Sequence, residues 1–314
     1  MEKKLTVAIT TYNRREYLIT QLKSLECQGH YDQYAIIVFN NKSNYNVEEA
    51  LREALSPDFM EIVTVKNRKY NVGGDCNIAL SFQDVDTPWM WLLSDDDVTT
   101  PSSLETVLAD IEKYQDVCWL KYSIEGGFKA FEDEKISDLA ELFEKCSAEA
   151  GHGWGEFVFM SNNVYNMKYL YPYIGELIFY ASTSFSQLIA PMFAMKNDNV
   201  PMILRSFRLT NYEGGRISYS NYYAYLNFPN LIYTRFSLTK TEIKGYKKIF
   251  NVKGRQLVSS LLDVKDKAVR CEYMKKYVMF YRFGNPFKKT FWRIAFMLIN
   301  TLEINKDTLK KCFG

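Results

Sequence analysis

The chain has 314 residues, of which 24% are charged and 47% are hydrophobic. Both fractions are close to the average for globular proteins, so the composition excludes a disordered chain and predicts one or two folded domains. The formal net charge is only +2, and the six cysteines form no Cys-x-x-Cys pair, which argues against a disulfide scaffold or a zinc site.

The first 122 residues alternate between short apolar runs and amphipathic segments. By periodicity, strands are expected at 5–10, 34–39, 61–66, 89–93 and 117–122. Helices are expected between them, at 15–28, 47–55, 75–82 and 101–116. Strands that alternate with helices predict an α/β fold, with a mostly parallel sheet and helices on both of its faces.

The pattern is weaker beyond residue 123. A helix is expected at 137–149, a strand at Phe157–Val164 and a mainly helical stretch at 176–196. Residues 241–314 are expected to form a helical, basic C-terminal extension. We therefore expect a catalytic domain over residues 1–240 and a separate segment over 241–314.

Four polar loops follow predicted strands directly. They are residues 11–14, 40–44, 67–74 and 94–97. In open α/β sheets, ligands bind at the carboxyl ends of the strands. The four loops are therefore expected to meet at one edge of the sheet and to form one site.

The last of these loops carries three adjacent carboxylates, Asp95–Asp97. Like charges at such spacing repel, and a divalent cation that bridges to a diphosphate would offset them. Oxygen ligands favour Mg²⁺ or Mn²⁺. An acidic turn that caps the helix beginning near Pro101 is the alternative, because carboxylates also stabilise helix N-termini.

The order of these loops resembles the family 2 glycosyltransferases with the GT-A (Rossmann-like) fold, especially bacterial capsule and lipopolysaccharide sugar transferases. The opening Thr-Tyr-Asn-Arg, the Asn-Asn-Lys-Ser loop, the Asn-x-Gly-Gly loop and the acidic run each match a family element. One departure is Asn40, where the family has Asp. The resemblance implies that a set of residues from these loops binds the nucleotide sugar. They are Thr11, Tyr12, Asn13, Arg14, Asn40, Asn41, Ser43, Asn71, Gly73, Gly74, Asn77, Asp95 and Asp96.

In the same resemblance, Asp97 binds the metal ion together with Asp95, and Asp95 also lies towards the donor sugar in the catalytic centre. Members of this type usually invert the anomeric carbon, and a carboxylate takes the acceptor proton. The family would place that base near residues 182–187, which contain no acid here. Glu176 is the substitute candidate, and an ordinary exposed glutamate at a helix start is the alternative reading of it.

The positive charge is concentrated at the C-terminal end. Residues 240–314 carry a net charge of +12 and the preceding residues −10. Residues 275–300 interleave basic and aromatic side chains, which is typical of a helix on an anionic membrane surface. A helix packed on the catalytic domain is the alternative. The apolar run at the N-terminus is too short for a signal peptide, which favours a cytoplasmic protein. The basic C-terminal segment would place it at the inner face of the membrane.

Together these patterns predict a glycosyltransferase that uses a nucleotide sugar, most simply a UDP-sugar, and Mn²⁺ or Mg²⁺. The acceptor is expected to be a saccharide or a polyprenyl-linked saccharide of bacterial surface polysaccharide synthesis. Two alternatives stay open: a non-catalytic nucleotide-sugar or saccharide-binding protein, and a nucleotidyltransferase. Nucleic acid is not an expected partner, because the acidic body would oppose a polyanion.

Overall fold

The computed structural model describes residues 2–124, 129–211, 231–232, 235–250 and scattered positions between 268 and 301. It divides into two compact units. The first holds Met1–Arg216 and Leu238–Ile249, and the second holds Ile217–Ser237 and Phe250–Gly314. In the part of the chain that is described, no helix combines the length and the apolar character needed to cross a bilayer.

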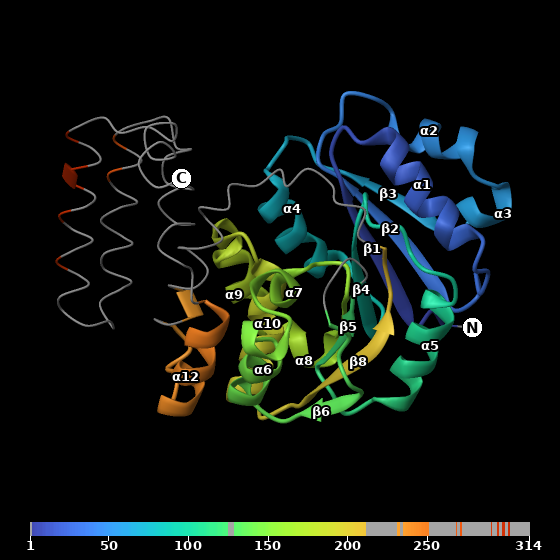
Figure 1. Ribbon diagram of the computed structural model, residues 1–314. Coiled ribbons are helices and arrows are strands. Elements are labelled where there is room, and N and C mark those ends of the chain that lie inside the picture. Colours follow the sequence, from blue (N-terminus) through green and yellow to red (C-terminus); the bar gives the residue numbers. More distant parts are fainter. Residues whose placement is uncertain are drawn as a thin grey trace. The chain divides into compact units, whose positions relative to one another are not determined.

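An eight-stranded, mostly parallel sheet forms the centre of the first unit (Figure 1). Its strands, in chain order, are β1 Leu5–Thr11, β2 Tyr34–Asn40, β3 Val63–Asn67, β4 Trp89–Ser94, β5 Trp119–Ser123, β6 Glu134–Ile136, β7 Asn163–Asn166 and β8 Met202–Arg208. Their order across the sheet is β3-β2-β1-β4-β7-β5-β8-β6. Among these strands, β7 runs antiparallel to β4 and β5, and β6 runs antiparallel to β8.

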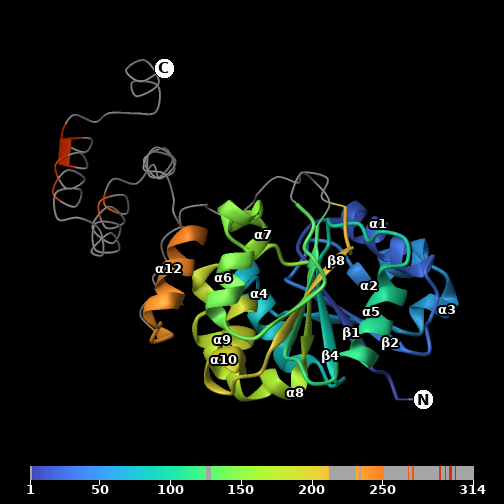
Figure 2. The same cartoon turned by 60° about the horizontal axis from the view of Figure 1, so that its bottom comes forward.

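Four helices cover one face of the sheet (Figures 1 and 2). They are α1 Arg15–Glu26, α2 Val47–Ala54, α3 Pro57–Met60 and α5 Ser103–Lys113. The apolar side of α1, with Leu18, Leu22 and Leu25, is buried in one core with Val7 and Ile9 of β1. This core holds the strands in register and so holds the ends of the strands level.

The opposite face carries a second group of helices (Figures 1 and 2). The group contains α4 Gly74–Ser81, α6 Leu139–Lys145, α7 Trp154–Val158, α8 Met167–Leu170, α9 Ile174–Phe179 and α10 Ile189–Asn197. Helix α12, Lys240–Ile249, packs against α6, where Gly245 leaves room for Phe143. The first unit thus extends past residue 240, while the function of the 241–314 segment stays a prediction.

The α/β fold and the first five strands agree with the sequence prediction, with boundaries shifted by one or two residues. The strand expected at Phe157–Val164 is wrong in its first part. Residues 154–158 form α7, and β7 begins only at Asn163. The helical stretch at 176–196 is interrupted by two one-turn 3-10 helices, η4 Ala181–Thr183 and η5 Ser186–Leu188. Apolar content alone does not separate a short helix from a strand.

Candidate active site at the carboxyl edge of the sheet

The four polar loops lie at one edge of the sheet, as the sequence predicts. In the strand register, Thr11 pairs with Asn40 and Asn40 with Asn67, while Thr10 pairs with Ser94. The strands β1, β2, β3 and β4 therefore end at nearly the same level. Side chains from all four loops can contact one ligand there.

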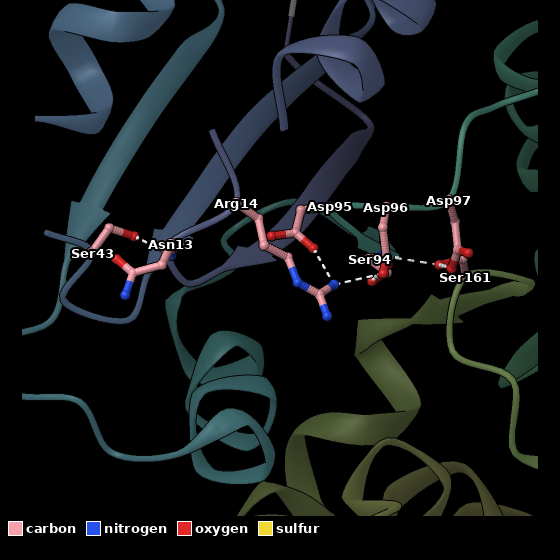
Figure 3. Close-up of polar contacts among 8 residues, drawn as sticks. All are labelled: Asn13, Arg14, Ser43, Ser94, Asp95, Asp96, Asp97 and Ser161. Atoms are coloured by element: carbon pink, nitrogen blue, oxygen red, sulfur yellow. Dashed lines mark hydrogen bonds and ion pairs between the residues drawn. The ribbon is translucent and has the colours of Figure 1, made fainter. Parts of the chain in front are cut away.

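The loop after β1 is joined to the loop after β2 (Figure 3). Asn13 has a φ of 55°, a left-handed conformation that asparagine tolerates better than most residues. Its N–H donates to Ser43 Oγ at 2.9 Å, and its Oδ1 accepts from the Asn44 N–H at 2.7 Å. Tyr12 is 45% exposed beside this link, so its ring is available to a ligand.

Two neighbouring asparagines brace the loops instead of pointing freely outward. Asn40 Nδ2 donates to Asn67 Oδ1 at 2.7 Å, and Asn40 Oδ1 accepts from the Ser43 N–H at 2.9 Å. Asn41 Nδ2 donates to Asn71 Oδ1 at 2.9 Å, while Asn41 Oδ1 accepts from the backbone of the same loop. Both are buried. An Asn at position 40 thus supplies a donor that an ionised Asp could not.

The glycine loop turns sharply into α4. Gly73 has a φ of 84°, which a residue with a Cβ would adopt only with strain, and Gly73 and Gly74 leave open space beside their α-carbons. Asn77 is buried in the first turns of α4, where its Nδ2 donates to the Phe39 carbonyl at 2.9 Å. The helix start is thereby fixed against the end of β2.

Arg14 supplies the positive charge nearest to the acidic loop. Its Nη1 donates to Asp95 Oδ1 at 3.1 Å and to Asp96 Oδ2 at 2.6 Å (Figure 3). Ser94 Oγ also donates to Asp96. The sequence predicts that a divalent cation offsets the repulsion between these carboxylates. In the structure, the Arg14 guanidinium already offsets part of that repulsion.

Asp97 is held from the other side by Ser161, in the turn before β7. Ser161 Oγ donates to Asp97 Oδ2 at 2.7 Å and accepts from the Ser94 N–H at 2.9 Å. Ser161 is fully buried. Ser161 has no local signal in the sequence, because it lies in the turn before β7 and reaches Asp97 only through strand pairing.

Burial makes both flanking carboxylates weaker acids. It raises the pKa of Asp95 to about 6, although the nearby Thr11 hydroxyl and Arg14 oppose the shift. It raises the pKa of Asp97 to about 7, although the Ser161 hydroxyl opposes it. The two side chains are only 3% and 8% exposed. A cation placed between them would restore the ionised forms.

The donor set fits one divalent cation of the Mg²⁺ or Mn²⁺ type. Asp95 Oδ2 is buried and has no hydrogen-bond partner at ordinary distance among the described residues, and Asp97 offers a second carboxylate from the same loop. Among the described residues, no three His, Cys, Asp or Glu side chains gather as a complete protein metal site. A divalent cation here would therefore need further oxygen ligands from the substrate, such as those of a diphosphate.

The candidate base lies in a different environment from the acidic loop. Glu176 is exposed in the first turn of α9 and belongs to a helix that packs against α4. A catalytic role for Glu176 stays a prediction. Another acid, Glu156 in α7, is fully buried, and burial raises its pKa to about 7.

The chain belongs to the Glycosyl transferase family 2, whose family model matches residues 6–187. An uncharacterised glycosyltransferase of Methanocaldococcus jannaschii is 29% identical over 155 residues, which are 46% of this chain and 53% of that protein. The matched part thus spans about half the length of this relative. Membership of this family agrees with the predicted glycosyltransferase class and not with the nucleotidyltransferase alternative.

Solved structures show the same fold at low identity. Residues 1–349 of TarS from S. aureus match with a TM-score of 0.56 and 14% identity, over 88% of this chain and 80% of that one. The same fragment in complex with UDP matches with a TM-score of 0.55 and 17% identity, over 89% of both chains. The mannosyltransferase PcManGT from Pyrobaculum calidifontis, in complex with GDP-Man and Mn²⁺, matches with a TM-score of 0.54 and 10% identity. The match covers 96% of this chain and 88% of that one. These likenesses confirm the GT-A fold.

Proposed function

We propose that the chain transfers a sugar from a nucleotide-sugar donor to a hydroxyl of a saccharide or lipid-linked saccharide. The observation that carries the proposal is the acidic loop with its Arg14 counter-ion, placed beside the Asn-rich and Gly-Gly loops at one sheet edge. A UDP-sugar is the first candidate donor. Among the structural neighbours, TarS has been solved with UDP and with UDP-GlcNAc, while PcManGT holds GDP-Man.

Each loop has its own part in donor binding. Tyr12 offers an exposed ring for a base, and the braced loops around Asn41 provide a fixed wall. The Gly73–Gly74 turn lets the backbone approach a phosphate closely. Asp97 and Asp95 would hold the divalent ion, which supplies charge stabilisation to the leaving diphosphate when bound.

The reaction we propose is a single displacement that inverts the anomeric carbon. The acceptor oxygen forms a bond to that carbon as the bond to the diphosphate breaks, and the nucleoside diphosphate leaves with the electron pair. Arg14, released from part of its pairing with the acidic loop, can orient towards the developing negative charge. A carboxylate of the chain takes the acceptor proton.

Synthesis of a bacterial surface polysaccharide at the inner face of the membrane is the proposed setting. The support is the resemblance of the motifs and the net charge of +12 over residues 240–314. Residues 275–300 lie almost entirely outside the described residues, so the argument rests on composition. Flotation with anionic liposomes should be lost on truncation after residue 270 while donor binding is kept, and flotation of the truncated protein would reject the membrane proposal.

The experiment that tests the function is a donor-consumption assay. Purified protein is incubated with UDP-, GDP-, CDP- and dTDP-sugars, with and without Mn²⁺, and release of the free nucleotide is measured with and without saccharide acceptors. Release from one nucleotide class, enhanced by an acceptor, supports the proposal. Absence of release from every donor under all conditions would contradict it.

A further inference from the structure

Asp75 lies in the first turn of α4, directly after the Gly73–Gly74 turn. The start of this helix is fixed at the carboxyl edge of the sheet, because Asn77 in the next turn donates to the end of β2 at 2.9 Å. Asp75 is partly exposed, unlike the acids of the acidic loop that flank the proposed metal position. Its carboxylate is therefore partly open to solvent near the carboxyl edge of the sheet.

The Asp75 side chain is held by a loop distant in sequence. Ser184 Oγ donates to Asp75 Oδ2 at 3.3 Å. Ser184 has a φ of 77°, which is unusual for a serine and costs on the order of 1 kcal/mol or more. Ser186 Oγ and Gln187 Oε1, a few residues further on, are buried and make no hydrogen bond to any described residue. The left-handed Ser184 backbone belongs to the turn that brings its hydroxyl to Asp75.

No cation neutralises Asp75 among the described residues, whereas Arg14 pairs with Asp95 and Asp96. The elements packed against α4 include η1, α9, η4 and η5, as well as β1. Of these, η4 and η5 carry no charged residue, and α9 carries only the exposed Glu176. The one-turn helix η1, Phe82–Asp84, carries Asp84, which pairs with Lys66 and Arg68. A carboxylate that is partly dehydrated and lacks a salt bridge keeps its basicity for a substrate proton.

We propose that Asp75 is the general base of the transfer, with Ser184 as the residue that positions it; this inference rests on the proposed function. In the step, the acceptor O–H proton passes to the Asp75 carboxylate while the acceptor oxygen bonds to the anomeric carbon. The anomeric carbon–phosphate oxygen bond breaks, and the nucleoside diphosphate takes the electron pair. The protonated Asp75 then loses its proton to solvent.

The environment agrees with this role. Burial raises the pKa of Asp75 above the ordinary aspartate value, and the Ser184 hydroxyl opposes that rise. Removal of the hydroxyl would therefore raise the pKa of Asp75 further. The acid limb of the kcat/KM profile, which reports ionisation of the free base, should move to higher pH in Ser184→Ala.

The test compares Asp75→Asn with wild type and with Asp32→Asn, a matched change at an exposed aspartate in the turn before β2. Asp75→Asn should lower kcat for transfer by about 10²- to 10⁴-fold, the range typical of a lost general base. The Kd of the donor, measured by calorimetry without acceptor, should change less than about threefold. Asp32→Asn should match wild type in both measurements.

Two results would overturn the assignment. One is transfer by Asp75→Asn within about fivefold of wild type, and the other is a large loss in Glu176→Gln without one in Asp75→Asn. A Ser184→Ala profile with an unmoved acid limb would reject the positioning role. If wild type itself neither binds nor consumes any nucleotide sugar, the proposed function has failed, which is a different outcome from an active wild type with an active Asp75→Asn.

Discussion

Ser161 Oγ donates a 2.7 Å hydrogen bond to Asp97 Oδ2 and so joins the turn before β7 to the acidic loop after β4. The two residues are 64 positions apart in the chain and both are buried. The antiparallel pairing of β7 with β4 brings the start of β7 to the carboxyl end of β4. One carboxylate of the proposed metal site is thus oriented by a residue outside the motif.

Ser161→Ala should weaken Mn²⁺ binding at pH 7 by roughly tenfold, because a hydrogen bond to a charged group is worth about 1.5–3 kcal/mol. Loss of the hydroxyl also raises the pKa of Asp97, so less of the carboxylate is ionised. Calorimetric titration with Mn²⁺ and donor measures the effect. Ser137→Ala, at an exposed serine, serves as the control, and equal Mn²⁺ affinities in the two variants would contradict the role of Ser161.

Stability should depend on pH through Asp97. Its folded pKa of about 7 lies above the unfolded value, so the protonated form favours the folded state. The stabilisation is complete below about pH 4 and is lost as pH rises towards 7 and above, by an amount on the order of 4 kcal/mol at about 1.4 kcal/mol per pKa unit. Urea unfolding of metal-free protein between pH 5 and 8 should show a smaller fall for Asp97→Asn than for wild type. Identical slopes would argue against the raised pKa.

Arg14→Met should make the acidic loop more dependent on a cation. The variant leaves Asp95 and Asp96 without the guanidinium that pairs with both, so their repulsion is no longer offset. Without metal, its Tm should fall at pH 8, and Mn²⁺ should raise the Tm of the variant more than that of wild type. Arg52→Met, at an exposed arginine on α2, controls for loss of charge alone. An equal rise in Tm with Mn²⁺ for wild type, Arg14→Met and Arg52→Met would contradict the role of Arg14 as the counter-ion of the acidic loop.

The hydrogen bonds of the Asn41 side chain should support both the stability of the fold and nucleotide binding. Asn41→Ala removes two hydrogen bonds between the loops after β2 and β3 and should cost about 1–3 kcal/mol of unfolding free energy and at least tenfold in nucleotide affinity. Asn44→Ala changes an exposed side chain whose backbone N–H makes the bond to Asn13, so it should leave both unchanged. Fluorescence titration with nucleotide distinguishes the two. A loss of affinity in Asn44→Ala as large as in Asn41→Ala would show that the brace is not the cause.

Sequence periodicity predicted the parallel half of the sheet well, because β1 to β4 are apolar runs that end in polar loops. The same reasoning placed Asn13, Asn41, Gly73 and Asp97 at one edge, since parallel strands share a direction. It did not reveal the partners of these residues. The pairing of Arg14 with the acidic loop and the contact of Ser184 with Asp75 depend on tertiary packing, which periodicity does not encode.

The second half of the first unit was harder to predict for a physical reason. Residues 154–188 form several helical segments of three to six residues, each stabilised by burial and not by its own periodicity. Phe157 and Val158 are buried in a helix although their neighbours suit a strand. The strand prediction there followed β-propensity, and packing overrode it.

The central claim is that the carboxyl edge of the sheet binds a nucleotide sugar with the help of Asp97. The most direct measurement is the thermal shift of wild type and Asp97→Ala with each nucleotide-sugar class, with and without Mn²⁺, because a ligand that binds the folded state raises the Tm by mass action. The account predicts a Mn²⁺-dependent rise with one class that Asp97→Ala loses. No rise with any donor, and a mutant that behaves like wild type, would contradict it.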